Sequence, residues 1–370
     1  MRVGLNATCF NNRPSGARQR FVGIYGELIK RLPDSEFVVY EPQDCQVGSW
    51  FADLPNAVSK RTPIPSEGRS KKLIQGWGYW KETLKDSQFD FFERFNLPVV
   101  TAPTGKTLMT VHDIRGVVTG NFFRKMAYKH YVGHSFEAAD HVITVSHSMK
   151  NEILDYFPDT PITVIYNGLN PGEFSQIPES ALAAFQIKYD LPKSFMLCVG
   201  HLEKRKNYLR LIDALLHLKK RGVDCPLLII GNNSGERQHI ESKIVSSGLE
   251  RQVLILNGLT DQEVCCAYRL CSLFVFPSAY EGFGIPILEA MGARRPMVLS
   301  DLPVFREITE DQSIYFPHDD AEAMADAIEL GLTSRAERER IVAYGDKRVG
   351  DFSFANLGKQ LADLYATFRA

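Results

Sequence analysis

The chain has 370 residues, more than one hydrophobic core usually supports, so we expect two domains with a cleft between them. Hydrophobic residues make up 44% and charged residues 24%, which is typical of folded globular proteins and excludes disordered, collagen-like and coiled-coil chains. The formal net charge of −1 excludes the overall basic field of a nucleic-acid-binding protein, so any site for an anion must be local.

Cysteine usage and the N-terminal sequence predict the compartment. The seven cysteines are scattered, without a C-x-x-C pair or a histidine at zinc spacing, which is typical of a reducing environment. The sequence MRVGLNATCFNNRP lacks the apolar core of a signal peptide, and no apolar run approaches the ~20 residues that span a bilayer. We therefore expect a cytoplasmic protein, with any membrane contact peripheral and on the inner face of the cytoplasmic membrane.

Short apolar runs alternate with helical stretches along the chain. In the first half they predict strands at 2–7, 37–40, 107–112, 141–145 and 163–165. In the second half they predict strands at 195–199, 227–230, 253–256, 273–276, 297–300 and 313–316. The runs of the second half are continuous rather than alternating, which is typical of strands buried on both faces. We therefore expect an α/β fold with a parallel, doubly wound sheet of the Rossmann type.

A turn-rich stretch, NGLNPGEFSQIP at 167–178, separates the two halves and suits a linker. We place the domain boundary at residue 170, which gives domains of 1–170 and 171–351. The last segment, 352–370, has apolar residues at helical spacing and predicts one amphipathic helix.

The segment PSAYEGFGIPILEAMGARRPMVLSD follows the predicted strand 273–276 and carries two carboxylates, Glu281 and Glu289. Pro286 suits the first turn of a helix, so the N–H groups of residues 283–285 are expected at the positive end of a helix dipole, where they can bind an anion. On the first turn of that helix, Glu289 can accept hydrogen bonds from vicinal hydroxyls beside a bound phosphate. The alternative is structural, with Glu289 complementing the helix dipole and Glu281 a solvated loop residue.

The two glutamates form an E-x7-E pair, and the string EGFGIPILEAM resembles the signature of the retaining GT-B-fold glycosyltransferases of family four (glycosyltransferase group 1), which include bacterial mannosyltransferases. The resemblance implies two Rossmann-like domains facing across a cleft, with the acceptor-side domain completed by helix 352–370. It implies that Glu281 faces hydroxyls of the transferred sugar and that Glu289 binds the ribose. The backbone of Phe283, Gly284 and Ile285 would meet the diphosphate.

The stretch VGHLEKRKNYLRLIDAL, after the predicted strand 195–199, is similar to the part of the family in which a cation binds the diphosphate. Lys206 falls on the usual lysine, and Arg205 can add a planar pair of donors. His201 stands where many members carry arginine. The alternative is a solvated basic turn. Leu259, in NGLTDQEV, is expected to pack against the base.

Two segments of the first half extend the resemblance. NNRPSGARQR follows the first predicted strand and places Gly16 where the family's first loop passes the donor phosphates. Its neighbours Arg18 and Arg20 suit an acceptor phosphate and a surface charge equally well. LMTVHDIRGVV resembles the family's HD segment, which implies that His112 faces the cleft near the donor sugar; a packed or capping histidine is the alternative.

No D-x-D segment ends a predicted strand, and a helix dipole with Lys206 can replace a divalent ion, so we expect neither a catalytic metal nor a cofactor. The resemblance implies retention by front-face attack, with the leaving phosphate taking the acceptor proton and Glu281 organising the sugar rather than attacking it. Other hypotheses are a GT-B phosphorylase, a nucleotide-sugar epimerase and a non-catalytic sugar-nucleotide-binding scaffold.

Two segments, 60–86 and 122–131, combine basic residues with aromatic ones, among them Trp77, Tyr79 and Trp80. Cations and interfacial rings suit a peripheral membrane face, and hence a polyprenyl-diphosphate-linked acceptor in cell-surface polysaccharide or lipopolysaccharide assembly. The alternative is a basic loop whose aromatic residues pack in the core. For the donor, the resemblance favours GDP-mannose or a related GDP-sugar and leaves UDP-sugars open.

Overall fold

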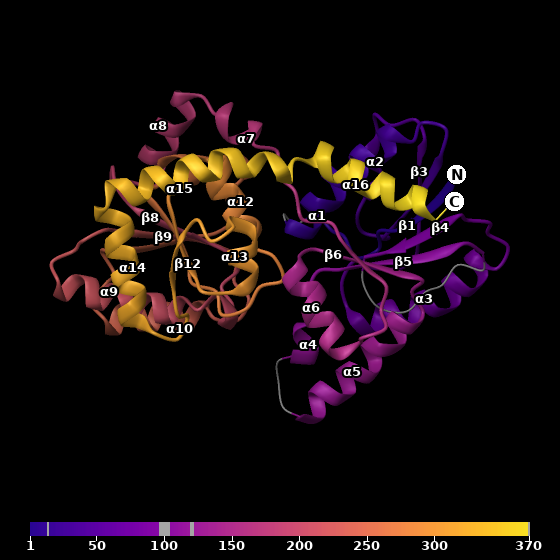
Figure 1. Cartoon of the computed structure of the whole chain (residues 1–370), viewed down its shortest axis with the longest axis horizontal. Helices are drawn as coiled ribbons and strands as arrows, with labels where there is room; N and C mark the ends of the chain where they lie inside the picture. Colours follow the sequence, from indigo (N-terminus) through magenta and orange to yellow (C-terminus); the bar gives the residue numbers. More distant parts are fainter. Residues whose placement is uncertain (13–14, 96–103, 119–121, 369–370) are drawn as a thin grey trace. The chain divides into compact units, whose positions relative to one another are not determined.

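The computed structural model describes residues 1–12, 15–95, 104–118 and 122–368 (Figure 1). The chain divides into two compact units. Unit 1 comprises Met1–Gly168 and Phe354–Ala370, and unit 2 comprises Leu169–Ser353. The division therefore falls close to residue 170, and the C-terminal helix belongs with the first half of the chain.

Unit 1 is built on a sheet whose described strands all pair in parallel, in the order β3-β2-β1-β4-β5-β6-β7. The strands are β1 (Arg2–Asn6), β2 (Glu36–Glu41), β3 (Ala57–Arg61), β4 (Phe91–Arg94), β5 (Lys106–Val111), β6 (His141–Thr144) and β7 (Ile162–Val164). The order reverses between β1 and β4, which makes the sheet doubly wound as expected for this α/β class.

Two strands, β3 and β4, escaped the sequence analysis for physical reasons. β3 lies at the edge of the sheet and most of its side chains are exposed, so it has no apolar run. β4 ends in Glu93 and Arg94, two charged side chains that are fully buried. Charged residues at buried positions break the apolar pattern on which strand prediction depends.

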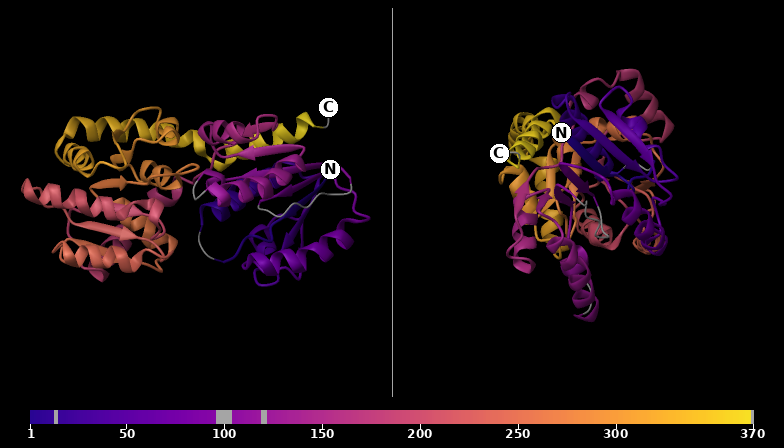
Figure 2. Two further views of the ribbon diagram at one scale, coloured as in Figure 1. Left: turned by 90° about the horizontal axis from the view of Figure 1, so that it is seen from below. Right: turned by 90° about the vertical axis from the view of Figure 1, so that its right-hand side faces the viewer.

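The helices of unit 1 lie on both faces of its sheet (Figure 2). They are α1 (Gly16–Arg20), the π-helical turn η1 (Phe21–Tyr25), α2 (Gly26–Arg31), the 3-10 turn η2 (Val47–Phe51), α3 (Arg69–Leu84), α4 (Arg115–Val118), α5 (Phe122–Glu137), α6 (His147–Tyr156) and α16 (Phe354–Thr367).

The C-terminal helix α16 packs on the core of unit 1 through Leu357, Leu361 and Tyr365. The Tyr365 hydroxyl donates to Glu93 Oε2 over 2.7 Å, and Thr110 Oγ1 donates to Glu93 Oε1 over 2.6 Å. Burial raises the pKa of Glu93, and these hydroxyl donors oppose that rise. A buried carboxylate thus links the last helix of the chain to the middle of the first sheet.

Unit 2 has the more regular sheet, with all described strands parallel in the order β10-β9-β8-β11-β12-β13. The strands are β8 (Met196–Val199), β9 (Leu227–Ile230), β10 (Val253–Leu256), β11 (Leu273–Phe276), β12 (Met297–Ser300) and β13 (Ile314–Phe316). The strands β9, β11 and β12 are fully buried, and the apolar runs of the second half predict the bounds of the strands to within a residue.

The helices of unit 2 cover both faces of this second sheet (Figure 2). They are α7 (Gly172–Ser175), α8 (Glu179–Lys188), the 3-10 turn η3 (Lys204–Lys206), α9 (Tyr208–Lys220), α10 (Arg237–Ser246), α11 (Asp261–Leu270), α12 (Ile285–Gly292), α13 (Pro303–Thr309), α14 (Ala321–Thr333), α15 (Arg335–Arg348) and the 3-10 turn η4 (Val349–Phe352).

Two expected segments differ from the structure at their bounds. The predicted linker 167–178 contains α7, and Leu169 pairs with Ser353 in an isolated parallel bridge, so it is not an irregular stretch. The predicted helix 352–370 begins at Phe354, after η4, because the backbone of Ser353 is extended. Among the helices described, none is long and apolar enough to cross a bilayer.

Candidate functional site

The switch point of the second sheet brings two predicted residues into contact. The strand order reverses between β8 and β11, and both strands send their next loop to the same edge of the sheet. Lys206, in the loop after β8, places its Nζ 2.7 Å from Glu281 Oε1, in the loop after β11. Arg205 places its NH1 2.6 Å from the same oxygen. One oxygen of the Glu281 carboxylate therefore pairs with two cations.

The backbone around Gly200 and Asn207 places Lys206 in this pair. Gly200 has φ 154°, and a Cβ at this position would lie 2.9 Å from Lys206 Cε, so only glycine leaves the lysine its room. Asn207 ends the η3 turn in the left-handed conformation, with φ 58°, and its side chain donates to His318 O over 2.6 Å. Lys206 is buried, with its ammonium 4.6 Å from the ring centre of Phe276.

Glu281 is held as a carboxylate in a partly buried position. Burial alone would raise the pKa of Glu281, but Lys206 and Arg205 outweigh it and lower that pKa. Ser278, which is fully buried, donates its hydroxyl to Glu281 Oε1 over 2.8 Å. The sequence analysis missed Ser278. Its position in the same loop as Glu281 was the one feature that could have pointed to it.

Arg205 is shared among three acceptors rather than solvated. Its NH2 lies 2.7 Å from Glu203 Oε1, and its NH1 also donates to Tyr280 O over 3.1 Å. The alternative of a solvated basic turn is therefore wrong for Arg205 and Lys206, which are anchored by Glu203 and Glu281.

The helix α12 begins directly after the glycine turn of the E-x7-E string. Gly284 has φ 122°, Ile285 is the first helical residue, and Pro286 lies in the first turn, as the sequence predicts. The positive end of a helix dipole favours an anion, and this terminus follows the loop that carries Glu281 beside the switch point. Phe283 and Gly284 are buried, and Ile285 is half-buried.

Glu289 lies just beyond the first turn of α12. Counting from Ile285 it is the fifth helical residue, so its expected place on the first turn is wrong. Tyr268, from α11, donates its hydroxyl to Glu289 Oε2 over 2.7 Å. Burial, with the nearby charges of Glu173 and Asp261, raises the pKa of Glu289 to about 7, although the hydrogen bond from Tyr268 opposes the rise. No local pattern predicts the role of Tyr268, because its contact with Glu289 depends on how α11 packs on α12.

The remaining predicted residues of unit 2 lie at the same edge of the sheet. His201 follows β8 and Gly200, and its side chain is exposed. Leu259 is half-buried and lies between β10 and α11, at the outer strand of the sheet.

Gly16 and His112 belong to unit 1, and each follows a strand of its sheet. Gly16 is the first residue of α1, whose N-cap is Ser15. His112 follows β5 and is half-buried, and burial together with the Arg20 charge lowers its pKa to about 3. His112 is therefore a neutral imidazole at physiological pH.

Arg20 is buried, which excludes the hypothesis that it is a surface charge. Its side chain is buried and donates through NH1 to Ile165 O over 2.7 Å and to Tyr166 O. Among the described residues, its Nε and NH2 have no hydrogen-bond partner. Arg18 donates to Asn12 O and lies 4.7 Å from the ring centre of Trp50.

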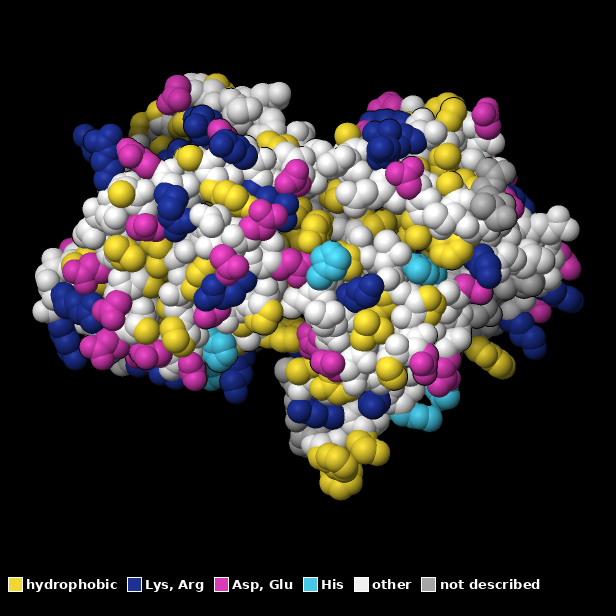
Figure 3. Space-filling model, in the orientation of Figure 1, with side chains coloured by type: hydrophobic (Ala, Val, Ile, Leu, Met, Phe, Trp, Pro, Cys, Tyr) yellow, Lys and Arg dark blue, Asp and Glu magenta, His cyan; other side chains and the backbone are white. Residues whose placement is uncertain are grey.

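The two basic aromatic segments divide between core and surface. Trp80 is buried against Tyr40 and Phe92, so the prediction that it faces a membrane is wrong. Trp77, on the same helix α3, is 78% exposed, and Phe123 of α5 is 82% exposed. The exposed hydrophobic residues of α5 form the tip of unit 1 at the bottom of Figure 3.

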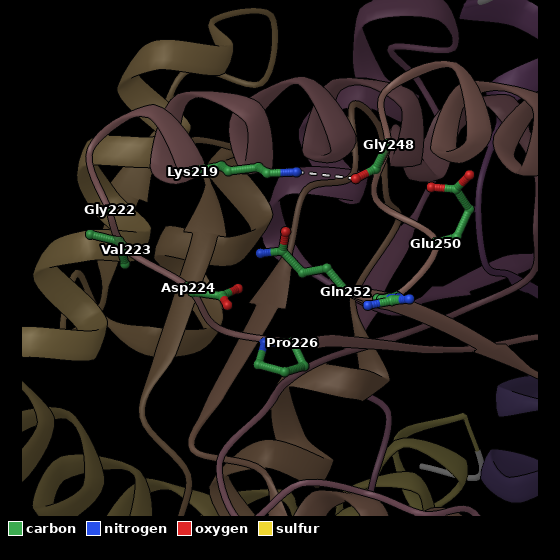
Figure 4. A pocket seen from close by; sticks show the side chains of 9 residues that line it. Lys219, Gly222, Val223, Asp224, Pro226, Gly248, Glu250 and Gln252 are labelled. Atoms are coloured by element: carbon green, nitrogen blue, oxygen red, sulfur yellow. Dashed lines mark hydrogen bonds between the residues drawn. The ribbon is translucent and has the colours of Figure 1, made fainter.

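A surface hollow of about 590 Å³ lies at the opposite edge of the second sheet. Its lining residues precede β9 and β10 or end α9, and Lys219 spans it by donating to Gly248 O over 3.1 Å (Figure 4). Because ligands of open parallel sheets bind at the carboxyl ends of the strands, this hollow is separate from the switch-point site.

Two protein-family models match the sequence, and together they cover most of the chain. Residues 29–173 match the model described as Glycosyltransferase Family 4, and residues 182–348 match the model described as Glycosyl transferases group 1.

Two relatives illustrate the sequence similarity. The O-antigen chain mannosyltransferase RfbU of Salmonella typhimurium is 30% identical over 224 residues, which cover 60% of this chain and 59% of the relative. The serotype-specific mannosyltransferase WbdA of Escherichia coli is 32% identical over 234 residues, covering 60% of this chain and 28% of the relative. The matches thus span less than two thirds of either relative.

Solved structures share the fold over the whole chain. WaaG, a glycosyltransferase involved in lipopolysaccharide biosynthesis, superposes with a TM-score of 0.77 at 16% identity, covering 99% of both chains. Anabaena HepE, in complex with UDP and glucose, superposes with a TM-score of 0.76 at 17% identity, covering 99% of both chains. These likenesses show a GT-B fold of two Rossmann-like units.

The raised pKa of Glu289 predicts how Glu289→Gln changes stability with pH. Because the folded pKa of about 7 lies above the ordinary value of 4.5, the stabilisation from protonated Glu289 is complete below about pH 4.5 and is lost as pH rises through 7. Between about pH 5 and 8 we therefore expect wild type to lose stability relative to Glu289→Gln, measured as the difference in unfolding midpoint.

Glu263→Gln is the matched control for this measurement. Lys188 and the Thr260 cap lower the pKa of Glu263 to about 2, so Glu263 stays ionised over the same pH interval. The difference in unfolding midpoint between Glu263→Gln and wild type should not change between pH 5 and 8. A pH-independent difference for Glu289→Gln would contradict the assigned environment of Glu289.

Proposed function

The chain belongs to the GT-B glycosyltransferases matched by the group 1 and family 4 models, and we propose that it transfers a hexosyl unit from a nucleotide-diphosphate sugar to a glycan or lipid-linked acceptor. The observation that carries the proposal is the arrangement at the switch point of unit 2. Two anchored cations and the N-terminus of α12 meet there at one edge of the sheet. Cations and the positive N-terminus of a helix together suit a diphosphate.

The proposed donor site uses each predicted residue of unit 2 in a distinct way. Lys206 and Arg205 bind the diphosphate with the backbone of residues 283–285. Glu289 accepts hydrogen bonds from the ribose hydroxyls, with Tyr268 fixing the orientation of its carboxyl group. Leu259 packs against the base, and His201 lies beside the diphosphate.

The proposed reaction needs electrostatic stabilisation more than covalent help. The C1–O bond between the sugar and the β-phosphate breaks, negative charge develops on the leaving diphosphate, and the acceptor oxygen bonds to C1 from the same face. The leaving phosphate takes the acceptor proton. Lys206 and the helix N-terminus stabilise the developing charge from fixed positions, which is often the largest contribution to catalysis. We propose that this occurs with retention and without a metal.

Glu281 organises the sugar in this scheme. Its Oε1 already accepts from Lys206, Arg205 and Ser278, which favours a fixed hydrogen-bonding role over nucleophilic attack. For unit 1 the proposal keeps two roles from the family resemblance: His112, neutral because of its low pKa, as a hydrogen-bonding partner for a sugar hydroxyl, and Gly16 as a residue of a phosphate-facing loop.

For the donor we propose a GDP-sugar, with GDP-mannose first, over a UDP-sugar. The support is that the relatives RfbU and WbdA are named as mannosyltransferases. For the acceptor we propose a polyprenyl-diphosphate-linked glycan of polysaccharide or lipopolysaccharide assembly, since RfbU is named for the O-antigen chain.

A panel of GDP, UDP, ADP and CMP tests the donor by thermal shift, because a ligand of the folded state raises the unfolding midpoint with its occupancy. We expect GDP to give the largest shift and GDP-mannose to be slowly hydrolysed or transferred. A response confined to UDP would overturn the choice of base. Binding of nucleotide sugar without any turnover would favour the non-catalytic scaffold instead.

We also propose that unit 1 contacts the membrane peripherally, on the inner face of the cytoplasmic membrane. On α3, Ile74 and Trp77 are each 78% exposed, and Lys81 Nζ lies 6.0 Å from the ring centre of Trp77. On α5, Phe122 and Phe123 are 69% and 82% exposed. Exposed rings flanked by lysines suit the headgroup region of anionic lipid.

Flotation with anionic liposomes tests this membrane contact. We expect binding at low salt that weakens at high salt, and loss of most binding in Phe122→Ser combined with Phe123→Ser. The control is Val245→Ser, a substitution of a 62% exposed residue in unit 2 that should leave flotation unchanged. Wild-type protein that stays in the soluble fraction at low salt would contradict the proposal.

A further inference from the structure

Glu281 forms ion pairs with Lys206 and Arg205, the two cations that would bind a diphosphate. Its Oε1 lies 2.7 Å from Lys206 Nζ and 2.6 Å from Arg205 NH1. We infer that Glu281 is an internal competitor for the diphosphate, which weakens the binding of the nucleoside diphosphate product and so speeds its release. This inference rests on the proposed function, because it concerns the same site.

The burial of the three charges makes this competition strong. The side chains of Lys206 and Glu281 are 7% and 10% exposed, and that of Arg205 is 23% exposed. Water screens charges poorly at such positions, so the contacts of Glu281 with the cations are charge-assisted hydrogen bonds rather than weak surface pairs.

A phosphate oxygen that reaches Lys206 must displace Glu281 Oε1 or share the ammonium with it. Displacement leaves a buried carboxylate with fewer partners, and sharing places negative charges side by side. Either outcome reduces the net gain from phosphate binding. The same contact holds Lys206 in place before the donor arrives, which lowers the cost of ordering its long side chain.

The competitor role differs from the sugar-organising role in what it predicts for the bare nucleotide. A nucleoside diphosphate has no sugar for Glu281 to organise. If Glu281 acted only on the sugar, its removal would leave nucleoside diphosphate binding unchanged. If it competes, its removal strengthens that binding.

Calorimetric titration of wild type and Glu281→Gln with GDP, UDP and inorganic pyrophosphate tests the inference. Glutamine keeps an acceptor for Ser278 but removes the charge. We expect Glu281→Gln to bind the diphosphates about tenfold more tightly and to release a fluorescent nucleoside diphosphate correspondingly more slowly. Pyrophosphate makes the result independent of which base the site accepts.

Two further variants separate competition from a general effect of charge or folding. Glu203→Gln removes a carboxylate that pairs with NH2 of Arg205, whereas Glu281 pairs with both Arg205 NH1 and Lys206, so the gain in affinity of Glu203→Gln should be smaller. Glu281→Asp retains the charge, so its affinity should stay closer to wild type than that of Glu281→Gln. Unfolding midpoints confirm that each variant is folded.

The outcomes distinguish this inference from the proposed function. If wild type binds neither nucleoside diphosphate nor pyrophosphate, the proposed function is wrong and the inference falls with it. If wild type binds and folded Glu281→Gln binds equally or more weakly, the inference alone is overturned. Tighter binding in Glu281→Gln than in Glu203→Gln supports it.

Discussion

The ion cluster of Glu281, Lys206 and Arg205 is the interaction on which the rest of the site depends. A carboxylate this far from water stays ionised only because two cations lie within 2.7 Å of it. The cluster in turn requires that β8 and β11 be neighbours, since the loop after β8 supplies the cations and the loop after β11 supplies the carboxylate. The fold thus brings these three charged side chains together at the switch point of the sheet.

Small backbone features make this cluster possible. Gly200 leaves space for the Lys206 side chain, and Asn207 turns the chain directly from the cation loop into α9. On the other side, Gly284 starts α12 immediately after the Glu281 loop. Cations, carboxylate and helix N-terminus therefore converge at one edge of a rigid sheet, which is the preorganisation that anion chemistry needs.

The sequence predicts the fold best where side chains are uniformly apolar. The strands β9, β11 and β12 of unit 2 are fully buried, so their apolar runs are continuous and their bounds are clear. β4 was missed because Glu93 and Arg94 are charged yet buried, and hydroxyl groups from distant segments such as Tyr365 satisfy Glu93. No local pattern contains that information.

The same limit applies to the site. The E-x7-E string and Lys206 could be found from the sequence because each lies in a short continuous string that resembles the family's. The contacts of Lys206 and Arg205 with Glu281 could not be predicted, because they join loops that follow different strands. The burial of Trp80 and the partner of Glu289, Tyr268, likewise depend on how helices pack, which local spacing does not determine.

The central claim is that a nucleoside diphosphate binds at the carboxyl edge of the second sheet through Lys206. The most direct measurement is calorimetric titration of GDP and UDP into wild type, Lys206→Met and Lys219→Met, where Lys219 lines the hollow at the opposite edge. The account predicts that Lys206→Met weakens binding of the preferred nucleotide at least about tenfold, while Lys219→Met binds like wild type. Unchanged affinity in Lys206→Met, or a loss confined to Lys219→Met, would contradict it.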